Sequence, residues 1–89
     1  MPSRTVTIAS KIGLHARPAG LFAAEAAKAP VPVTIAKSGG DAVDARSLLS
    51  VLTLDIRGGD EVELTAEDGE GADAALDSLV ALLEIDHDA

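Results

Sequence analysis

The sequence predicts an α+β fold, an open-faced two-layer sandwich in which three helices cover one face of a four-stranded antiparallel sheet. Segments that alternate apolar and polar residues indicate strands with one solvated face, which is typical of antiparallel sheets. Other segments carry apolar residues at helical spacing, and the two kinds follow the order β-α-β-β-α-β-α. Because one sheet face is polar, the helices must share the other. We expect residues 1–89 to form a single domain.

The first third of the chain is predicted to contain a strand, a loop and a helix. Residues 4–9 alternate and predict a half-buried strand, and residues 10–13 indicate a loop. Residues 18–28 are rich in alanine and favour a helix, with Pro18 in the first turn, where its missing N–H costs nothing. The apolar stripe of this helix consists of Ala19, Phe22, Ala23 and Ala26.

The middle of the chain is predicted to form a hairpin. Residues 31–36 alternate and indicate a strand, but Pro32 cannot donate to a ladder. Pro32 is therefore expected at a sheet edge or at the beginning of the strand. Gly39-Gly40 indicates a turn, and residues 42–43 a short return strand.

The last third is predicted to form a helix, a strand and a final helix. Residues 48–54 mix leucine with β-branched residues, and their apolar spacing favours a short helix with Ser47 as its N-cap. Residues 57–60 indicate a turn, and the clean alternation of residues 61–66 predicts a strand. Apolar spacing then predicts a helix over 72–85.

Composition narrows the class of protein. The chain has 7 Lys and Arg against 15 Asp and Glu, a net charge of −8, so nucleic acid and anionic lipid are poor partners. No apolar run of membrane-spanning length and no signal peptide is present, and there is no cysteine, which together indicate a cytoplasmic protein. Phe22 is the single aromatic residue, so the core must be built from Ala, Val, Leu and Ile.

The stretch Gly13-Leu14-His15-Ala16-Arg17-Pro18-Ala19 carries the candidate chemistry. His15 and Arg17 flank a predicted helix start, whose unpaired N–H groups and dipole favour an anion. The guanidinium of Arg17 matches phosphate oxygens, and the positive field leaves the imidazole neutral and able to act as a nucleophile. The competing interpretation is a loop histidine that bonds to a backbone carbonyl. We expect transient phosphorylation of His15.

Other chemistries fit this stretch poorly. No cysteine is available as a nucleophile, and no pattern joins a serine to His15. The other histidine, His87, lies between two aspartates near the end of the chain and indicates a solvated residue rather than a metal ligand. No phosphate-binding glycine loop leads into Gly-Lys-Ser/Thr. We therefore expect no metal and no cofactor, and a phosphoryl group that comes from another protein.

The chain resembles the histidine-containing phosphocarrier (HPr) family of the bacterial phosphoenolpyruvate:sugar phosphotransferase system. The resemblance rests on residues 13–19, on Gly59-Asp60-Glu61-Val62 and on the order of elements, and it covers residues 4–85. It implies a carrier with a phosphohistidine intermediate rather than a free-standing enzyme. His15 would accept a phosphoryl group on Nδ1 from enzyme I, which phosphoenolpyruvate charges, and pass it to the A domains of sugar permeases. Arg17 would hold the phosphoryl oxygens.

The resemblance also implies a regulatory position at Ser47, the serine that a dedicated kinase phosphorylates in some bacteria. The simpler interpretation is a helix N-cap, and the two are compatible. The sequence has Leu49 and Ser50 where regulated members carry methionine and glycine.

An apolar docking surface is expected beside His15, and we expect Leu49 to be its most exposed member, because adjacent leucines cannot both point inward from one narrow stripe. The surface is expected to consist of Leu21, Leu48, Leu49 and Leu52. The carboxylates of the last strand and helix should lie away from His15; they are Glu61, Glu63, Glu67, Asp68, Glu70 and Asp73. We expect a monomer. The alternatives are a carrier in a nitrogen-linked regulatory relay and a non-phosphorylated regulatory binding domain of the same fold.

Overall fold

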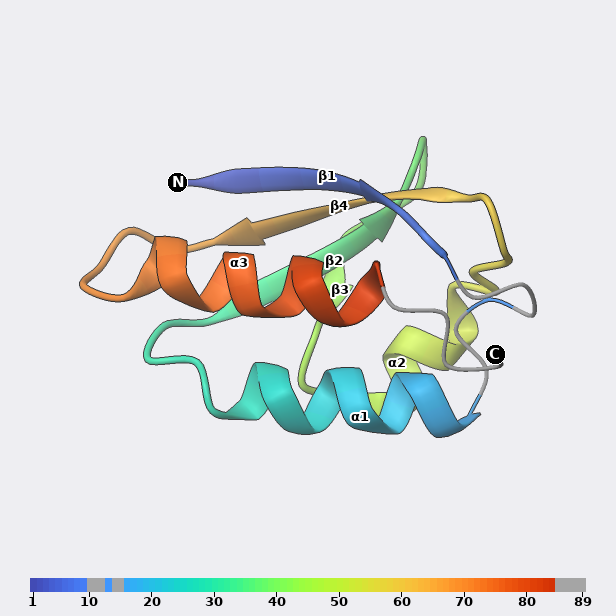
Figure 1. Cartoon of the computed structure of the whole chain (residues 1–89), viewed down its shortest axis with the longest axis horizontal. Coiled ribbons are helices and arrows are strands. Elements are labelled where there is room, and N and C mark those ends of the chain that lie inside the picture. Colours follow the sequence, from blue (N-terminus) through green and yellow to red (C-terminus); the bar gives the residue numbers. More distant parts are fainter. Residues whose placement is uncertain (10–12, 14–15, 85–89) are drawn as a thin grey trace.

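The seven expected elements occur in the expected order in the computed structural model, which describes residues 1–9, 13 and 16–84. The strands form one antiparallel sheet in the order β1-β4-β2-β3, and the helices lie together on one of its faces (Figure 1). This arrangement confirms the predicted open-faced sandwich. The elements are β1 Ser3–Thr7, α1 Ala16–Ala27, β2 Val33–Lys37, β3 Val43–Asp44, α2 Leu48–Thr53, β4 Glu61–Ala66 and α3 Ala72–Leu83.

Strand β4 is central, because it pairs with β1 along one side and with β2 along the other. Val62 lies opposite Val6 of β1, and Leu64 lies opposite Ile35 of β2. Opposed residues point to the same face, so these apolar pairs form the floor of the core. The alternate positions of β4 leave Glu61, Glu63 and Thr65 on the open face.

Three of the four strands have bounds that differ from the prediction; the smallest difference is at β3, which spans Val43–Asp44 rather than residues 42–43. Strand β1 ends at Thr7 rather than residue 9, because Ile8 pairs with the turn before β4: its N–H donates to Asp60 O at 2.9 Å and its carbonyl accepts from Gly59 N at 3.0 Å. Strand β2 begins at Val33 rather than residue 31, because Pro32 cannot donate to a ladder. The carbonyl of Pro32 still accepts from Glu67 N at 3.1 Å.

The helix boundaries also shift by one or two residues. Helix α1 begins at Ala16, so Pro18 lies at its third position, still within the first turn. Helix α2 ends at Thr53, one residue before the predicted end. Helix α3 ends at Leu83; its predicted end at residue 85 lies outside the described residues. No helix in the described part of the chain is long and apolar enough to cross a membrane.

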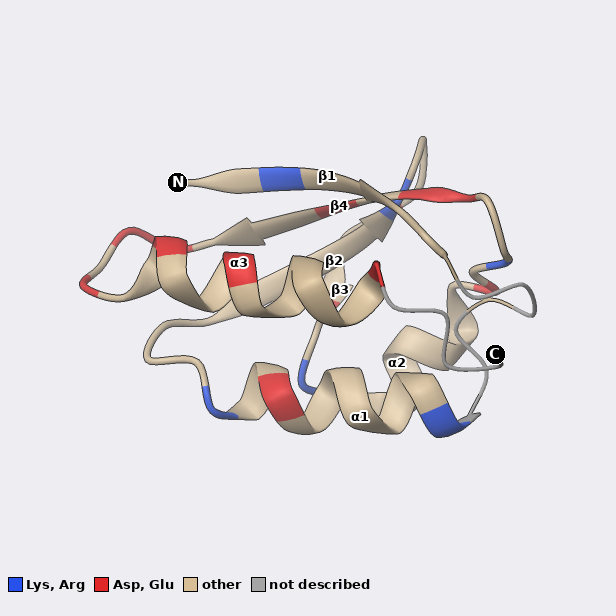
Figure 2. Ribbon diagram, in the orientation of Figure 1, with Lys and Arg blue, Asp and Glu red and all other residues tan. Residues whose placement is uncertain are grey.

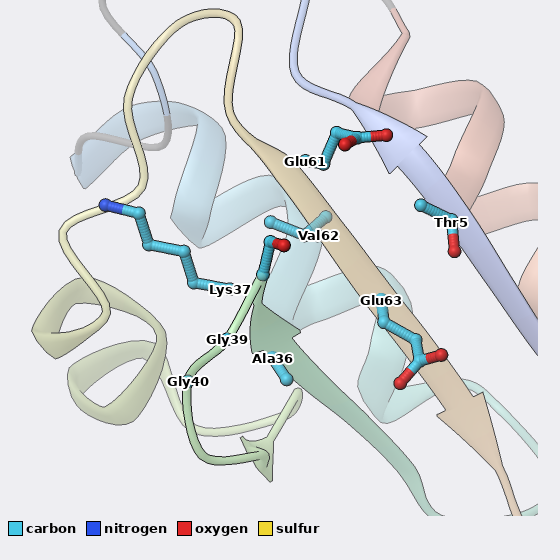
Figure 3. A pocket seen from close by; sticks show the side chains of 9 residues that line it. Thr5, Ala36, Lys37, Gly39, Gly40, Glu61, Val62 and Glu63 are labelled. Carbon is cyan, nitrogen blue, oxygen red and sulfur yellow. The ribbon is translucent and has the colours of Figure 1, made fainter.

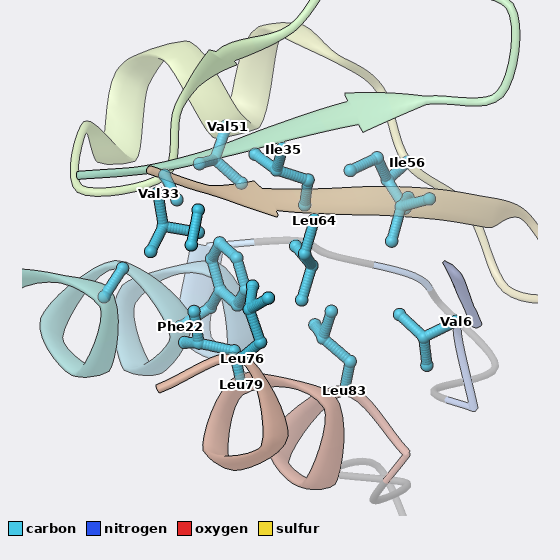
Figure 4. Close-up of a cluster of buried hydrophobic side chains, with 14 of the residues drawn as sticks. Val6, Phe22, Val33, Ile35, Val51, Ile56, Leu64, Leu76, Leu79 and Leu83 are labelled. Atoms are coloured by element: carbon cyan, nitrogen blue, oxygen red, sulfur yellow. The ribbon is translucent and has the colours of Figure 1, made fainter. Parts of the chain in front are cut away.

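Phe22 of α1 lies fully buried at the centre of the core (Figure 4). Around it pack aliphatic side chains from the sheet and from all three helices, as the composition predicted. Burying such a side chain stabilises the fold by about 1.5–3 kcal/mol. The largest of its buried companions are Ile35, Leu64, Leu76, Leu79, Val33, Val51 and Val62.

Candidate functional site

The start of α1 carries an exposed positive charge that could bind an anion. Ala16 is the first helical residue, so His15, the predicted acceptor, immediately precedes the helix in sequence; Leu14 and His15 themselves lie outside the described residues. The Arg17 side chain is exposed, and within the described ranges no group makes an ion pair or side-chain hydrogen bond with it. The first turn contains no acidic residue. The guanidinium is therefore available to a phosphoryl group, and the dipole of α1 favours an anion at its start.

Gly13 holds the chain before His15 against a distant segment. Its backbone is buried and has a φ of +87°, which disfavours any residue with a side chain. A Cβ at this position would overlap the carbonyl oxygen of Ile56 and come within 2.5 Å of the Arg57 Cα. Only glycine therefore fits, and the turn that follows α2 supports the approach to the site.

A hydrogen-bonded carboxylate holds that turn together. The Asp60 side chain accepts from the Arg57 backbone N–H at 2.9 Å and lies 3.2 Å from the Lys37 ammonium. The bond from Arg57, and then the one from Lys37, lowers the pKa of Asp60 below its usual value. Asp60 is thus ionised and paired, so its charge is compensated close to the position of Gly13.

Asp55 begins the same segment with a left-handed backbone, at a φ of +53°. Its carbonyl accepts from the Lys37 ammonium at 3.0 Å, and its carboxylate pairs with Arg57 at 3.1 Å. The sequence suggested a turn at 57–60 but did not indicate the roles of Lys37, Asp55 and Asp60. The available signal was only the glycine-rich composition of the turn.

Ser47 is the N-cap of α2, as predicted. Its backbone is extended and its hydroxyl accepts from Ser50 N at 3.3 Å. The neighbouring Arg46 is bonded to Asp44 at 3.1 Å, which lowers the pKa of Asp44. A phosphate on Ser47 would therefore compete with Asp44 for the Arg46 guanidinium. Phosphorylation at this position stays a prediction.

Three of the four leucines expected to form a docking surface are exposed. Leu49 is 76% exposed, Leu21 48% and Leu48 39%, which confirms that Leu49 projects furthest into solvent. Leu52 is half-buried and packs against the core, so it offers less surface. Leu21 lies one turn after Arg17 on α1, and α1 packs against α2. The leucine surface therefore adjoins the start of α1; its role in docking stays a prediction.

Most of the carboxylates expected to avoid the site do so. The turn at 67–71 and the start of α3 lie at the opposite end of the molecule from the start of α1 (Figure 2). Arg4 pairs there with Asp73 at 3.2 Å and with Asp77 at 3.3 Å. Glu61 is the exception, because it begins β4 at the same end as the α1 start, although its side chain lies on the open face of the sheet.

A cavity of about 230 Å³ lies on the open sheet face, away from the helices (Figure 3). Two carboxylates border it, so it is a poor site for a phosphoryl group. Within the described ranges, no three His, Cys, Asp or Glu side chains are grouped to hold a metal ion. The cavity is lined by Thr5, Ala36, Lys37, Ser38, Gly39, Gly40, Glu61, Val62 and Glu63.

Comparison with known proteins identifies the family of the chain. A family model described as "PTS HPr component phosphorylation site" matches residues 2–84. A phosphocarrier protein HPr from Streptomyces coelicolor is 49% identical over 83 residues, covering 93% of this chain and 88% of the relative. A phosphocarrier protein NPr from Shewanella violacea is 39% identical over 85 residues, covering 96% and 91%.

The fold is shared as well. A crystal structure of HPr from Bacillus anthracis matches with a TM-score of 0.85 at 35% identity, covering 92% of this chain and 95% of that one. The resemblance inferred from residues 13–19 is confirmed by a family match that spans nearly the whole chain. This chain belongs to the HPr family, the phosphocarrier proteins of the phosphotransferase system.

Proposed function

We propose that this chain accepts a phosphoryl group on Nδ1 of His15 from enzyme I, charged by phosphoenolpyruvate, and passes it to the A domains of sugar permeases. The observation that supports the proposal is the positive electrostatic character of the start of α1. There the exposed Arg17, free of described partners, lies two residues after His15 in a helix with no acidic residue in its first turn. The carrier works in the cytoplasm as a single domain and as a monomer.

The transfer is a simple displacement at phosphorus. The lone pair of the neutral Nδ1 forms the new N–P bond while the bond between phosphorus and the donor side chain breaks, and that electron pair stays with the donor. Arg17 and the N–H groups of Ala16 and Arg17 stabilise the charge on the phosphoryl oxygens. A solvent-exposed site with few strong donors leaves the group transferable, because tight ground-state binding would slow the next transfer.

Enzyme I and the permease A domains dock on the leucine surface formed by Leu21, Leu48 and Leu49. Exposed leucines of this kind contribute to transient interfaces when they lie beside the reacting group. Leu52 is half-buried and packs against the core, so it contributes less to this surface. A serine kinase is a further proposed partner, acting on Ser47, where added negative charge would disfavour docking of an acidic partner.

The test is labelling of the intact protein. Incubation with phosphoenolpyruvate and enzyme I is expected to add one phosphoryl group that is lost in acid and kept in base. His15→Ala should not be labelled, and the matched control His87→Ala should be labelled as the unmodified chain is. Labelling that survives His15→Ala, or no labelling of the unmodified chain, would rule out the proposal.

A nitrogen-linked relay is the second candidate function, favoured by the 39% identity to a phosphocarrier NPr. The chemistry at His15 would be the same, and only the partners would differ. The two functions are distinguished by a competition experiment, in which the phosphoryl donor enzyme of the sugar branch and that of the nitrogen branch compete to phosphorylate this chain. The third candidate, a non-phosphorylated binding domain, predicts no labelling by either.

A further inference from the structure

Lys37 binds both ends of one segment of the chain. It is the last residue of β2 and lies opposite Val62, so its side chain leaves the sheet on the helix-covered face. Its ammonium donates to the carbonyl of Asp55 at 3.0 Å and lies 3.2 Å from the carboxylate of Asp60. Figure 3 shows this side chain extended away from Thr5 and Glu63, toward the segment that precedes β4. One charge therefore holds residues 55–60 at their start and at their end.

The segment 55–60 in turn supports the chain that leads into the site. Ile8 exchanges two backbone hydrogen bonds with it, through Asp60 O and Gly59 N. Gly13 packs against the backbone of Ile56 and Arg57 with no room for a Cβ. Ile8 and Gly13, which lie on either side of positions 9–12 in the sequence, are thus both positioned by the same six-residue segment.

We infer that Lys37 is a positioning residue of the phosphoryl-transfer site. Its ammonium fixes the segment 55–60, and the segment fixes Gly13, which lies two residues before His15 in the sequence. Lys37 acts through this segment, to which two of its three N–H donors are directed, at Asp55 and Asp60. The inference rests on the proposed function of His15.

The alternative is an ion pair that contributes only to stability. The side chains of Lys37 and Asp60 are 35% and 31% exposed, and exposed pairs of this kind contribute little to folding. The two roles have different signatures. A purely structural pair would leave transfer by the folded protein unaltered, whereas a positioning residue would change it.

The experiment compares three variants in the full chain. Lys37→Met removes the charge and keeps the length, and Lys37→Arg restores the charge. Lys28→Met is the matched control, because Lys28 is exposed, lies beyond the far end of α1 and, among the described residues, pairs only with Glu25, at 3.6 Å. The kcat and KM of enzyme I are measured with each variant as phosphoryl acceptor, at a temperature where urea titration shows every variant folded. Amide resonances of Gly13 and Ala16 are followed by NMR.

Lys37→Met is expected to lower kcat about tenfold with KM changed less than about twofold, since misplacement of a reacting group affects the transition state more than docking. In Lys37→Met the Gly13 and Ala16 resonances should also move. Lys37→Arg should recover most of the lost kcat. Lys28→Met should change neither the kcat nor these resonances. An unchanged kcat, or unmoved resonances, in Lys37→Met would overturn the inference. If the unmodified chain accepts no phosphoryl group, the proposed function fails, and the resonances alone decide the role of Lys37.

Discussion

At the scale of single residues, Gly13 is the most constrained position near the site. Its left-handed backbone and the backbone of Ile56 and Arg57 leave no space for a side chain. Gly39 has a similar φ, +80°, but nothing lies within 4 Å of where its Cβ would be. Substitution of Gly39 therefore measures the free-energy cost of the left-handed backbone alone, whereas substitution of Gly13 adds the cost of the steric contact.

Gly39→Ala is expected to lower the free energy of unfolding by about 1 kcal/mol, the cost of a left-handed alanine. Gly13→Ala should cost about 2–4 kcal/mol, because the turn at 56–57 must also move. Urea titration of both variants measures the difference. Equal losses for the two substitutions would mean that the contact at Gly13 contributes nothing.

At the scale of elements, α2 depends on its cap, because it has only six residues. A helix this short gains little from its own propensity, so Ser47 and the burial of Val51 hold it in place. Leu48 and Leu49, by contrast, are 39% and 76% exposed. The cap therefore supports the part of the molecule that presents the leucine surface.

Ser47→Ala is expected to lower the free energy of unfolding by about 1 kcal/mol, since the Ser50 N–H loses its acceptor. Ser47→Asp keeps an acceptor at the cap and should stay within about 0.5 kcal/mol of the unmodified chain. Chemical denaturation measures both, with the exposed turn residue Ser38 changed to Ala as a control. A Ser47→Ala protein as stable as that control would show that the hydroxyl does not cap α2.

Elements were predictable where a pattern was local. Residues 61–66 alternate without interruption after a glycine-rich turn, and β4 has those bounds. The predicted start of α1 is two residues late, because proline is favoured throughout the first turn and here lies at its third position. The bonds of Lys37 to Asp55 and Asp60 could not be predicted from the sequence. The alternation of apolar and polar residues assigns a side chain to one face of the sheet, but it does not show which distant turn that side chain contacts.

At the scale of the whole molecule, part of the acidic charge lies far from the leucine surface. The acidic turn before α3 lies at the opposite end from the start of α1 (Figure 2). The leucine surface, by contrast, includes Leu21, one turn after Arg17. Part of the negative charge is thereby kept away from the expected docking side. Long-range repulsion of an acidic partner is correspondingly reduced.

Leu49→Ala tests the leucine surface. We expect the KM of enzyme I for the variant to rise about tenfold, because an exposed leucine at an interface loses its contact, while stability changes by less than about 0.5 kcal/mol. Leu52→Ala should show the opposite pattern, with a loss of about 2 kcal/mol in stability and little change in KM. An unchanged KM for Leu49→Ala would place the docking surface elsewhere.

The most direct test of the central claim is to locate the phosphoryl group atom by atom. After phosphorylation by enzyme I, NMR spectra that correlate the imidazole nitrogens with their ring protons and with phosphorus should assign the group to Nδ1 of His15. The resonances of Arg17 and of the first amides of α1 should shift with it, because they hold the phosphoryl oxygens. A phosphoryl group on His87, on Nε2, or on any residue other than His15 would contradict the account.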